Sequence, residues 1–172
     1  LSPRELQVLR LLATGHRAAV ISRVLSISLS TVRTQISSLL AKLEVASQLE
    51  AVGMGVSTSV GIGGDPINGS SFTDHLKAFE QDPDTSIVIV IGEIGGPQEA
   101  EAAAYARDHM HKKVIAYIAG LSAPRGRTMG HAGAIVTGAG ESAAEKIQIM
   151  RDCGVIVVER PSDFGAVISK IL

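Results

Sequence analysis

The spacing of the hydrophobic positions changes near Val56. Before this point, apolar residues recur three, four and seven positions apart, which is the spacing of one face of a packed helix. After it, short continuous runs of valine and isoleucine alternate with stretches of helical character. The pattern therefore predicts a small all-α region followed by a larger region in which strands and helices alternate.

Three helices are predicted in the first region. Ser2 can cap the first helix, with Pro3 at its first position and Glu5 three residues after the cap, as a capping box requires. This helix is expected to end at Gly15, a second short helix follows, and Ser28 can cap the third. The apolar face of the third helix consists of Val32, Ile36, Leu39, Leu40 and Leu43. These elements predict a small domain that contains a helix-turn-helix.

The second region predicts a parallel sheet with helices. Continuous valine and isoleucine runs indicate strands that are covered on both faces. Ser142 and Glu145 have the spacing of a capping box at the start of one helix. The expected strands are 56–62, 87–91, 114–118 and 155–158, and the expected helices are 71–80, 98–109, 142–153 and 162–172. We therefore predict a flavodoxin-like α/β domain.

Charge divides at nearly the same place as the hydrophobic pattern. Up to Gly55 there are six Lys and Arg residues against three Glu, whereas the remainder holds ten basic and 14 acidic residues. A basic N-terminal segment joined to an acidic body indicates two regions with different partners.

The single cysteine, Cys153, excludes an internal disulfide, and no apolar run approaches the roughly 20 residues that cross a bilayer. With no visible signal peptide, a cytoplasmic protein without a membrane partner is expected.

A glycine-rich stretch around His131 is the candidate catalytic motif. Its small neighbours let a phosphoryl group and backbone N–H donors approach an imidazole that can act as a nucleophile, although an ordinary glycine-rich turn fits the spacing equally well. Four motifs in one order resemble the C-terminal domain of the succinyl-CoA ligase α subunit, of the NDP-forming acyl-CoA ligase family. These motifs are Gly61-Ile62-Gly63-Gly64-Asp65-Pro66-Ile67, Ile91-Gly92-Glu93-Ile94-Gly95-Gly96, Ile118-Ala119-Gly120 with Ala123-Pro124, and Met129 through Ile135. The resemblance extends over residues 53–172.

Ligands of such sheets lie beyond the carboxyl ends of the strands, so the glycine-rich loops are expected to meet there and to bring Glu93 near His131. The resemblance implies that His131 is the phosphorylated histidine and Glu93 its supporting carboxylate. The backbone N–H groups of Gly133, Ala134 and Ile135 can hold the phosphoryl group or the carboxylate of the acid substrate. For a full ligase the resemblance implies CoA, ATP or GTP, Mg and a nucleotide-binding β-type subunit. No metal site is predicted in this chain itself.

Residues 1–52 resemble the LuxR-type DNA-binding domain. The resemblance is carried by Leu1-Ser2-Pro3-Arg4-Glu5, Val8-Leu9, Ile27-Ser28 with Thr31-Val32, and Lys42-Leu43-Glu44-Val45. It implies that the third helix enters the major groove of double-stranded DNA. Base edges would then be met by Arg33, Thr34 and Ser37, and phosphates by Ser30, Thr31 and Lys42. The solvated face of an ordinary helix is the alternative.

A separate fourth helix, 47–52, is expected to form the contact between two copies, because this helix usually has that role in the LuxR family. The ligase resemblance also implies missing parts: no CoA-binding domain is encoded, and the strand and helix start that precede the Gly-Asp-Pro loop are absent. The first βα unit of the sheet is therefore incomplete. Because the lost strand is internal to such a sheet, the domain must rearrange, borrow a strand from another copy or be marginally stable.

Three hypotheses follow for a chain divided into domains 1–52 and 53–172. The first is a phosphohistidine-carrying ligase domain fused to a DNA-binding domain, which cannot turn over without its partners. The second is a LuxR-type regulator whose acidic body is passive or oligomerises. The third is an artificial junction with neither activity.

Overall fold

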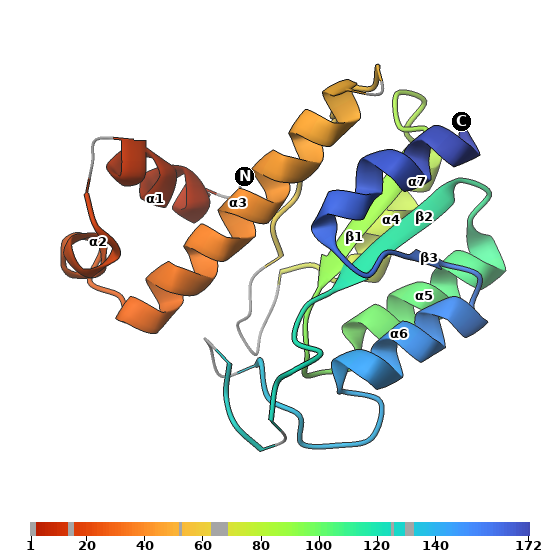
Figure 1. Ribbon diagram of the computed structural model, residues 1–172. Coiled ribbons are helices and arrows are strands. Elements are labelled where there is room, and N and C mark those ends of the chain that lie inside the picture. The colour runs from red at the N-terminus through yellow and green to blue at the C-terminus, as the bar shows by residue number, and fades with distance from the viewer. Residues whose placement is uncertain (1–2, 14–15, 52, 63–68, 125, 130–132) are drawn as a thin grey trace. The chain divides into compact units, whose positions relative to one another are not determined.

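The computed structural model describes residues 3–13, 16–51, 53–62, 69–124, 126–129 and 133–172 (Figure 1). The chain divides into two compact units. The first consists of Leu1–Gly61 with Pro161–Leu172, and the second is Ile62–Arg160.

The first unit begins with the three predicted helices: α1 (Pro3–Ala13), α2 (Ala18–Val24) and α3 (Leu29–Ala51). Their common core consists of the fully buried side chains Val8, Ile21, Val32 and Leu39. Ser28 caps α3 as predicted, because its hydroxyl oxygen accepts a hydrogen bond from the Thr31 N–H at 3.0 Å. A C-terminal segment completes the unit, with a 3-10 turn (Pro161–Asp163) and helix α7 (Phe164–Ile171) that contact α3.

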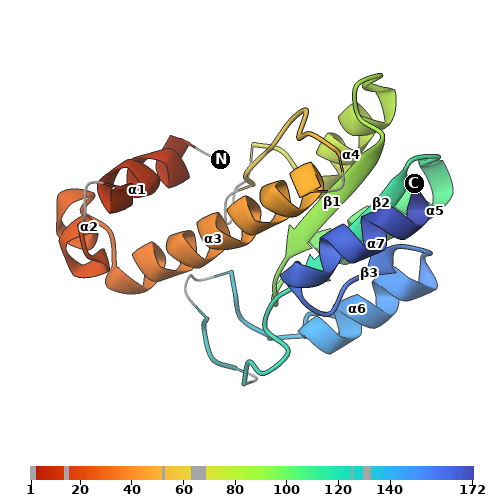
Figure 2. The same ribbon diagram turned by 45° about the horizontal axis from the view of Figure 1, so that its top comes forward.

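The prediction of a separate fourth helix at residues 47–52 was wrong. α3 instead continues without a break to Ala51 (Figure 2). No glycine or proline interrupts this stretch, which is rich in Leu, Ala, Glu, Gln and Lys, so local propensity favours one long helix. Gly53, with a φ of +77°, follows the end of the helix; its N–H donates to the Glu50 carbonyl, and the Met54 N–H donates to the Leu49 carbonyl.

The second unit contains a parallel sheet of three strands in the order β1-β2-β3. Its elements along the chain are α4 (Phe72–Gln81), β1 (Ile87–Gly92), α5 (Gln98–His109), β2 (Lys113–Ile118), α6 (Ala143–Asp152) and β3 (Ile156–Val157). Ile87 pairs with Lys113 at the start of β1 and β2, and Gly92 pairs with Ile118 at their end. The predicted α/β class and the parallel direction of the strands are confirmed.

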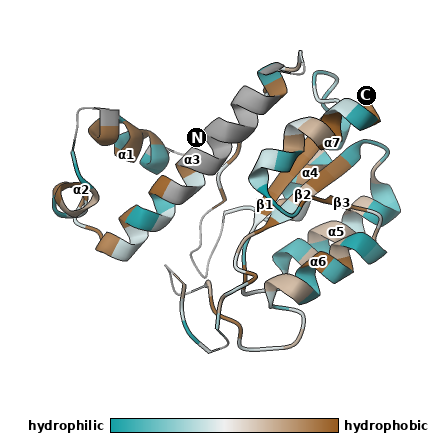
Figure 3. Ribbon diagram, in the orientation of Figure 1, coloured by the Kyte–Doolittle hydropathy of each residue, from teal (hydrophilic) through white to brown (hydrophobic). Residues whose placement is uncertain are grey.

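The helices α4, α5 and α6 pack in a row against the strands, α4 beside α5 and α5 beside α6 (Figures 1 and 2). Hydrophobic residues concentrate on β1 and β2 (Figure 3). Val88 and Val90 from β1 share one core with Leu76 from α4 and Met150 from α6. The capping box predicted at Ser142 is present at the start of α6. This core fixes the carboxyl ends of β1 and β2, where the loops of the candidate site begin.

The strand predicted at residues 56–62 is absent, so this prediction was wrong. Residues 54–62 form neither helix nor strand, and Val56 and Val60 are 51% and 41% exposed. In a flavodoxin-like sheet the second strand lies at the edge and pairs with the first strand alone. The described residues contain no strand in the place of that first strand, so the valine-rich segment has no pairing partner among them. Among the described residues, β1 pairs only with β2.

Candidate functional site

Two loops leave the sheet side by side at its carboxyl end. β1 ends at Gly92 and continues into the loop Glu93–Gly96, while β2 ends at Ile118 and continues through Ala119 and Gly120. The Ala119 N–H donates to the Gly92 carbonyl at 2.9 Å, so the two loops are hydrogen-bonded to each other where they leave the strands. Carboxyl-end loops of parallel strands are the usual ligand position of α/β folds.

The loop that carries Glu93 packs directly against Gly133–Ile135. At Gly95, whose φ is +90°, an added Cβ would overlap the Gly133 carbonyl oxygen and lie 2.9 Å from the Ile135 nitrogen. The two backbones approach too closely for any side chain at this position. Ile94 and Ala134 are both buried. The structure thus brings the segment of Glu93 together with three of the predicted phosphate-binding residues.

Replacing Gly95 by alanine is expected to destabilise the protein by about 2 to 4 kcal/mol, because steric overlap adds to the cost of a left-handed backbone. Gly96→Ala is a matched control, since Gly96 has a φ of +65° but open space where the Cβ would lie. We expect the control to cost about 1 kcal/mol. Urea unfolding of both variants measures the difference. Equal losses would show that the loops do not touch.

Two buried charged side chains, Lys146 and Glu99, are hydrogen-bonded to the backbone of the loop Glu93–Gly96. The Lys146 ammonium group donates to the carbonyls of Glu93 (2.8 Å) and Gly95 (2.5 Å) and to Glu99 Oε2 (2.5 Å). Glu99 Oε1 accepts the Glu93 N–H at 3.1 Å. Neither Lys146 nor Glu99 was predicted as a site residue. The capping box at Ser142 predicted where the helix that carries Lys146 begins. No local sequence pattern, however, predicts that a lysine is buried.

A turn from Thr137 to Glu141 also contacts the loop Glu93–Gly96 through a backbone hydrogen bond. The Glu141 carbonyl accepts the Gly95 N–H at 2.8 Å, and one oxygen of its carboxylate accepts the N–H groups of Thr137 (2.7 Å) and Gly138 (2.8 Å). These backbone hydrogen bonds, together with one from the Thr137 hydroxyl, lower the pKa of Glu141 below its ordinary value.

A pKa that is lower in the folded than in the unfolded state stabilises the fold above the ordinary pKa of the carboxyl, and this stabilisation is lost as pH falls through the lowered value. Glu141→Gln should therefore unfold at lower urea concentration than the wild type at about pH 7, and the difference should vanish once the pH has fallen below the lowered pKa of Glu141. Glu159→Gln, at an exposed position, is the control and should change little at either pH. A Glu141→Gln difference that persisted at low pH would contradict the assigned hydrogen bonds.

The predicted catalytic histidine, His131, lies outside the described residues. Of the nearby residues that are described, Gly133 is exposed, Ala134 is buried and Ile135 is half-buried. The Ile135 N–H donates to the Gly133 carbonyl at 3.0 Å, and the Met129 N–H donates to the Ala134 carbonyl at 2.8 Å. The segment on the C-terminal side of His131 therefore has a defined backbone course beside the loop of Glu93.

The candidate DNA-contacting residues lie at the start and middle of α3. Arg33 is exposed, one position after the fully buried Val32, so it points away from the helical core. Ser30 is exposed as well, and its hydroxyl lies 2.7 Å from that of Ser28, as does the hydroxyl of Thr31. Thr34 is half-buried. Ser37 and Lys42 belong to α3, but their side chains lie outside the described part of the structure.

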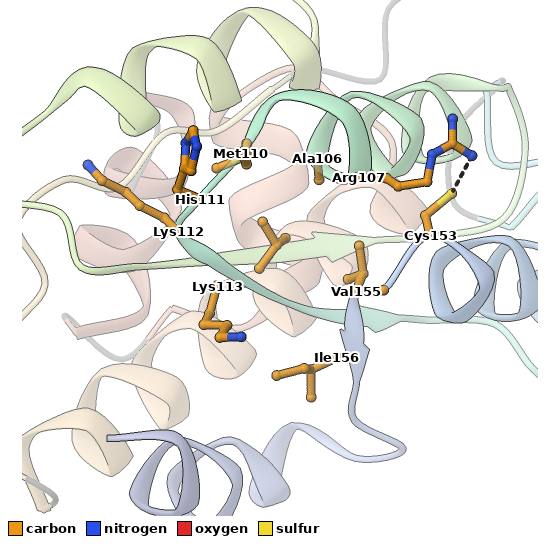
Figure 4. Close-up of a pocket in the computed structure, with 11 residues that line it drawn as sticks. Ala106, Arg107, Met110, His111, Lys112, Lys113, Cys153, Val155 and Ile156 are labelled. Atoms are coloured by element: carbon orange, nitrogen blue, oxygen red, sulfur yellow. Dashed lines mark hydrogen bonds between the residues drawn. The ribbon is translucent and has the colours of Figure 1, made fainter.

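A shallow pocket of about 250 Å³ lies at the opposite end of the sheet, where β2 and β3 begin (Figure 4). Three of its four basic lining residues, all except Lys113, have partners. Arg107 pairs with Asp108 at 2.7 Å, His111 Nδ1 lies 3.0 Å from Glu80, and the Lys112 ammonium donates to two backbone carbonyls. Cys153 Sγ lies 4.0 Å from the Arg107 guanidinium (Figure 4). The pocket is far from the carboxyl-end loops and offers a ligand no unpaired cluster of charge.

The described residues contain no candidate metal centre and no membrane-spanning helix. No three His, Cys, Asp or Glu side chains among them are grouped so that they could hold a metal ion. None of the helices that they form is long and apolar enough to cross a membrane.

Comparison with known families agrees with the geometry at the carboxyl ends of the strands. Residues 38–156 match the family model described as CoA-ligase. The chain belongs to the CoA-ligase family. Residues 1–55 match a second model, that of bacterial regulatory proteins of the luxR family. The two matches overlap in the C-terminal half of α3, so one continuous helix takes part in both.

Individual relatives place the similarity in ligase α subunits. The malate–CoA ligase subunit alpha of Methylorubrum extorquens is 59% identical over 129 residues, which cover 75% of this chain and 44% of the relative. The ADP-forming succinate–CoA ligase subunit alpha of Staphylococcus epidermidis is 51% identical over 122 residues, 71% of this chain and 40% of the relative. This chain therefore spans less than half the length of these ligase subunits, 44% and 40%.

Solved structures show the same fold. ATP citrate lyase from Methanosaeta concilii, in complex with (3S)-citryl-CoA, superposes with a TM-score of 0.59 and 27% identity. The superposition covers 63% of this chain and 18% of the lyase chain.

Proposed function

We propose that the ligase-type body of this chain accepts a phosphoryl group on His131. The observation that carries the proposal is the close packing of Gly95 on Gly133–Ile135, which supports a position for Glu93 beside the segment that follows His131. The similarity to α subunits of malate–CoA and succinate–CoA ligases supports the same chemistry.

In the proposed step, one nitrogen of the neutral imidazole attacks the terminal phosphorus of a nucleoside triphosphate. An N–P bond forms, the P–O bond to the nucleoside diphosphate breaks, and the diphosphate leaves with the bonding electrons. The product is a phosphoimidazolium, whose second nitrogen still holds its proton and donates it in a hydrogen bond to Glu93. The carboxylate orients the ring and stabilises the positive charge that develops on it. The backbone of Gly133 and Ala134 is proposed to hold the phosphoryl oxygens, because the Ile135 N–H already donates to the Gly133 carbonyl.

We further propose that residues 1–172 perform only this part of a ligase reaction. The aligned region covers only 44% and 40% of the two related subunits, which supports this division of the reaction. A β-type subunit would supply the nucleotide. The acid substrate is proposed to be a dicarboxylate, as the names of the related subunits indicate.

The test combines the full chain, a succinate–CoA ligase β subunit and γ-labelled ATP. We expect acid-labile label on this chain and, after addition of CoA and succinate, no CoA thioester. A complete α subunit treated in parallel is the control and should give both products. Absence of label on this chain while the control is labelled would overturn the proposal. Formation of the thioester would overturn the proposed need for further domains.

A second function is supported by a separate observation. The luxR-family match and the exposed Arg33 on the Ser28-capped helix favour binding of double-stranded DNA by the first unit. We propose that α3 reads the major groove through Arg33. A dimer on a two-fold symmetric site would raise the affinity of a single helix-turn-helix.

A further inference from the structure

A fully buried lysine is bonded to the loop of Glu93. Lys146 on α6 is 0% exposed, and its ammonium group has three acceptors: the Glu93 and Gly95 carbonyls of the loop and Glu99 Oε2. An ammonium group has three N–H donors, so all of them have a partner. A buried charge is tolerated when it is paired and fully hydrogen-bonded in this way.

Glu99 binds the N–H of Glu93, whereas Lys146 binds its carbonyl. The Glu99 side chain is buried, one oxygen pairs with Lys146, and the other accepts the Glu93 N–H at 3.1 Å. Gly92 makes room for it, because a Cβ at that position would lie 2.7 Å from the Glu99 carboxylate. The N–H and the carbonyl of Glu93 are therefore both held by the same buried ion pair.

We propose that Glu99 and Lys146 are positioning residues that direct the Glu93 carboxylate toward His131. The inference rests on the proposed function. Fixing the peptide groups on both sides of a residue fixes the direction of its Cα–Cβ bond, and hence the region that its carboxylate can reach. Buried ion pairs contribute little net stability compared with apolar residues of similar size. Their placement around one residue of a loop is thus better explained by geometry than by stability.

The test is a pH titration of the His131 ring by NMR in the full chain. The chain has five histidines, and His131→Gln assigns the signal. A nearby carboxylate stabilises the imidazolium and raises the pKa of the ring. We expect Glu93→Gln and Lys146→Met each to lower the pKa of His131 by about one unit. The other charged groups around the loop of Glu93, namely Glu99 and Glu141, are unchanged in both variants.

Lys112→Met is the matched control. The Lys112 ammonium also donates to two backbone carbonyls, of Phe79 and Asp82, but these lie at the C-terminal end of α4 rather than beside Glu93. We expect this variant to leave the pKa of His131 unchanged. If Lys146→Met does not fold, Glu99→Gln replaces it, since glutamine has nearly the same shape but only one oxygen and cannot hold both the Glu93 N–H and Lys146 as the two carboxylate oxygens do.

The outcomes separate this inference from the proposed function. A His131 pKa that falls in Glu93→Gln but not in Lys146→Met, or not in Glu99→Gln where that variant is used, would overturn the positioning role and leave the proposed function intact. An unchanged pKa in Glu93→Gln would overturn both, because Glu93 would then not face His131. An equal fall in Lys112→Met would show a general loss of structure and would also overturn the inference.

Discussion

Replacing His131 by glutamine is expected to abolish phosphorylation of this chain by ATP and a ligase β subunit. Glutamine has no nucleophilic ring nitrogen, so no N–P bond can form. Glu93→Gln should still accept phosphate but about a hundredfold more slowly, because the carboxamide can orient the ring without stabilising its charge. Incorporation of γ-labelled phosphate over time measures both effects.

His111→Gln is the control for this prediction. His111 also lies beside a carboxylate, with Nδ1 3.0 Å from Glu80, but it stands at the opposite end of the sheet and is exposed. Its replacement should leave the rate of labelling unchanged. Loss of label in His111→Gln with retention of label in His131→Gln would show that the phosphorylated residue is not His131 and does not lie in the carboxyl-end loops.

Arg33→Ala is expected to weaken sequence-specific DNA binding by about 10- to 100-fold, because a bidentate arginine contact to guanine contributes on the order of 1 to 3 kcal/mol of discrimination. The duplex used should be one selected from a random pool by the wild-type chain, with a scrambled duplex for comparison. Fluorescence anisotropy at several salt concentrations measures both affinities. The ratio between the two duplexes should fall toward unity in the variant.

Arg23→Ala removes the same charge from the exposed surface of α2. We expect it to weaken both duplexes alike and to leave their ratio unchanged, as for a contact to phosphate. A ratio unaffected by Arg33→Ala would show that Arg33 is not the base-reading residue. Wild-type affinity without dependence on salt would argue against DNA binding by the first unit.

The elements predicted correctly from sequence are those whose signals are local. α5 begins and ends at the predicted residues, in a stretch rich in Ala and Glu without internal glycine or proline. The helix after Ser142 was found through its capping box. β1 and β2 follow their valine and isoleucine runs closely, whereas β3 contains only Ile156 and Val157 of the predicted 155–158.

The errors arose where structure depends on partners far away in sequence, or where a family pattern was preferred to local composition. Residues 56–62 have strand-forming side chains, but a strand needs a neighbour, and the part of the chain that the structure describes holds no strand that pairs with them. The separate fourth helix was expected from the LuxR resemblance, although nothing in the sequence breaks α3 before Gly53.

The candidate site was predictable in part. That the loops after β1 and β2 share one end of the sheet follows from the direction of parallel strands alone. The contact between Gly95 and Gly133, and the ion pair of Glu99 with Lys146, required the structure. Both depend on how α6 and the loop before it fold back on the strands, and neither is encoded in a short motif.

Mass-spectrometric location of the phosphate tests the central claim most directly. The full chain would be phosphorylated with the β subunit and ATP, kept at alkaline pH to preserve phosphohistidine, digested and sequenced by fragmentation. We predict a single modified peptide with the phosphate on His131. Phosphate on any other residue, or an unmodified chain when a complete α subunit is phosphorylated under the same conditions, would contradict this claim.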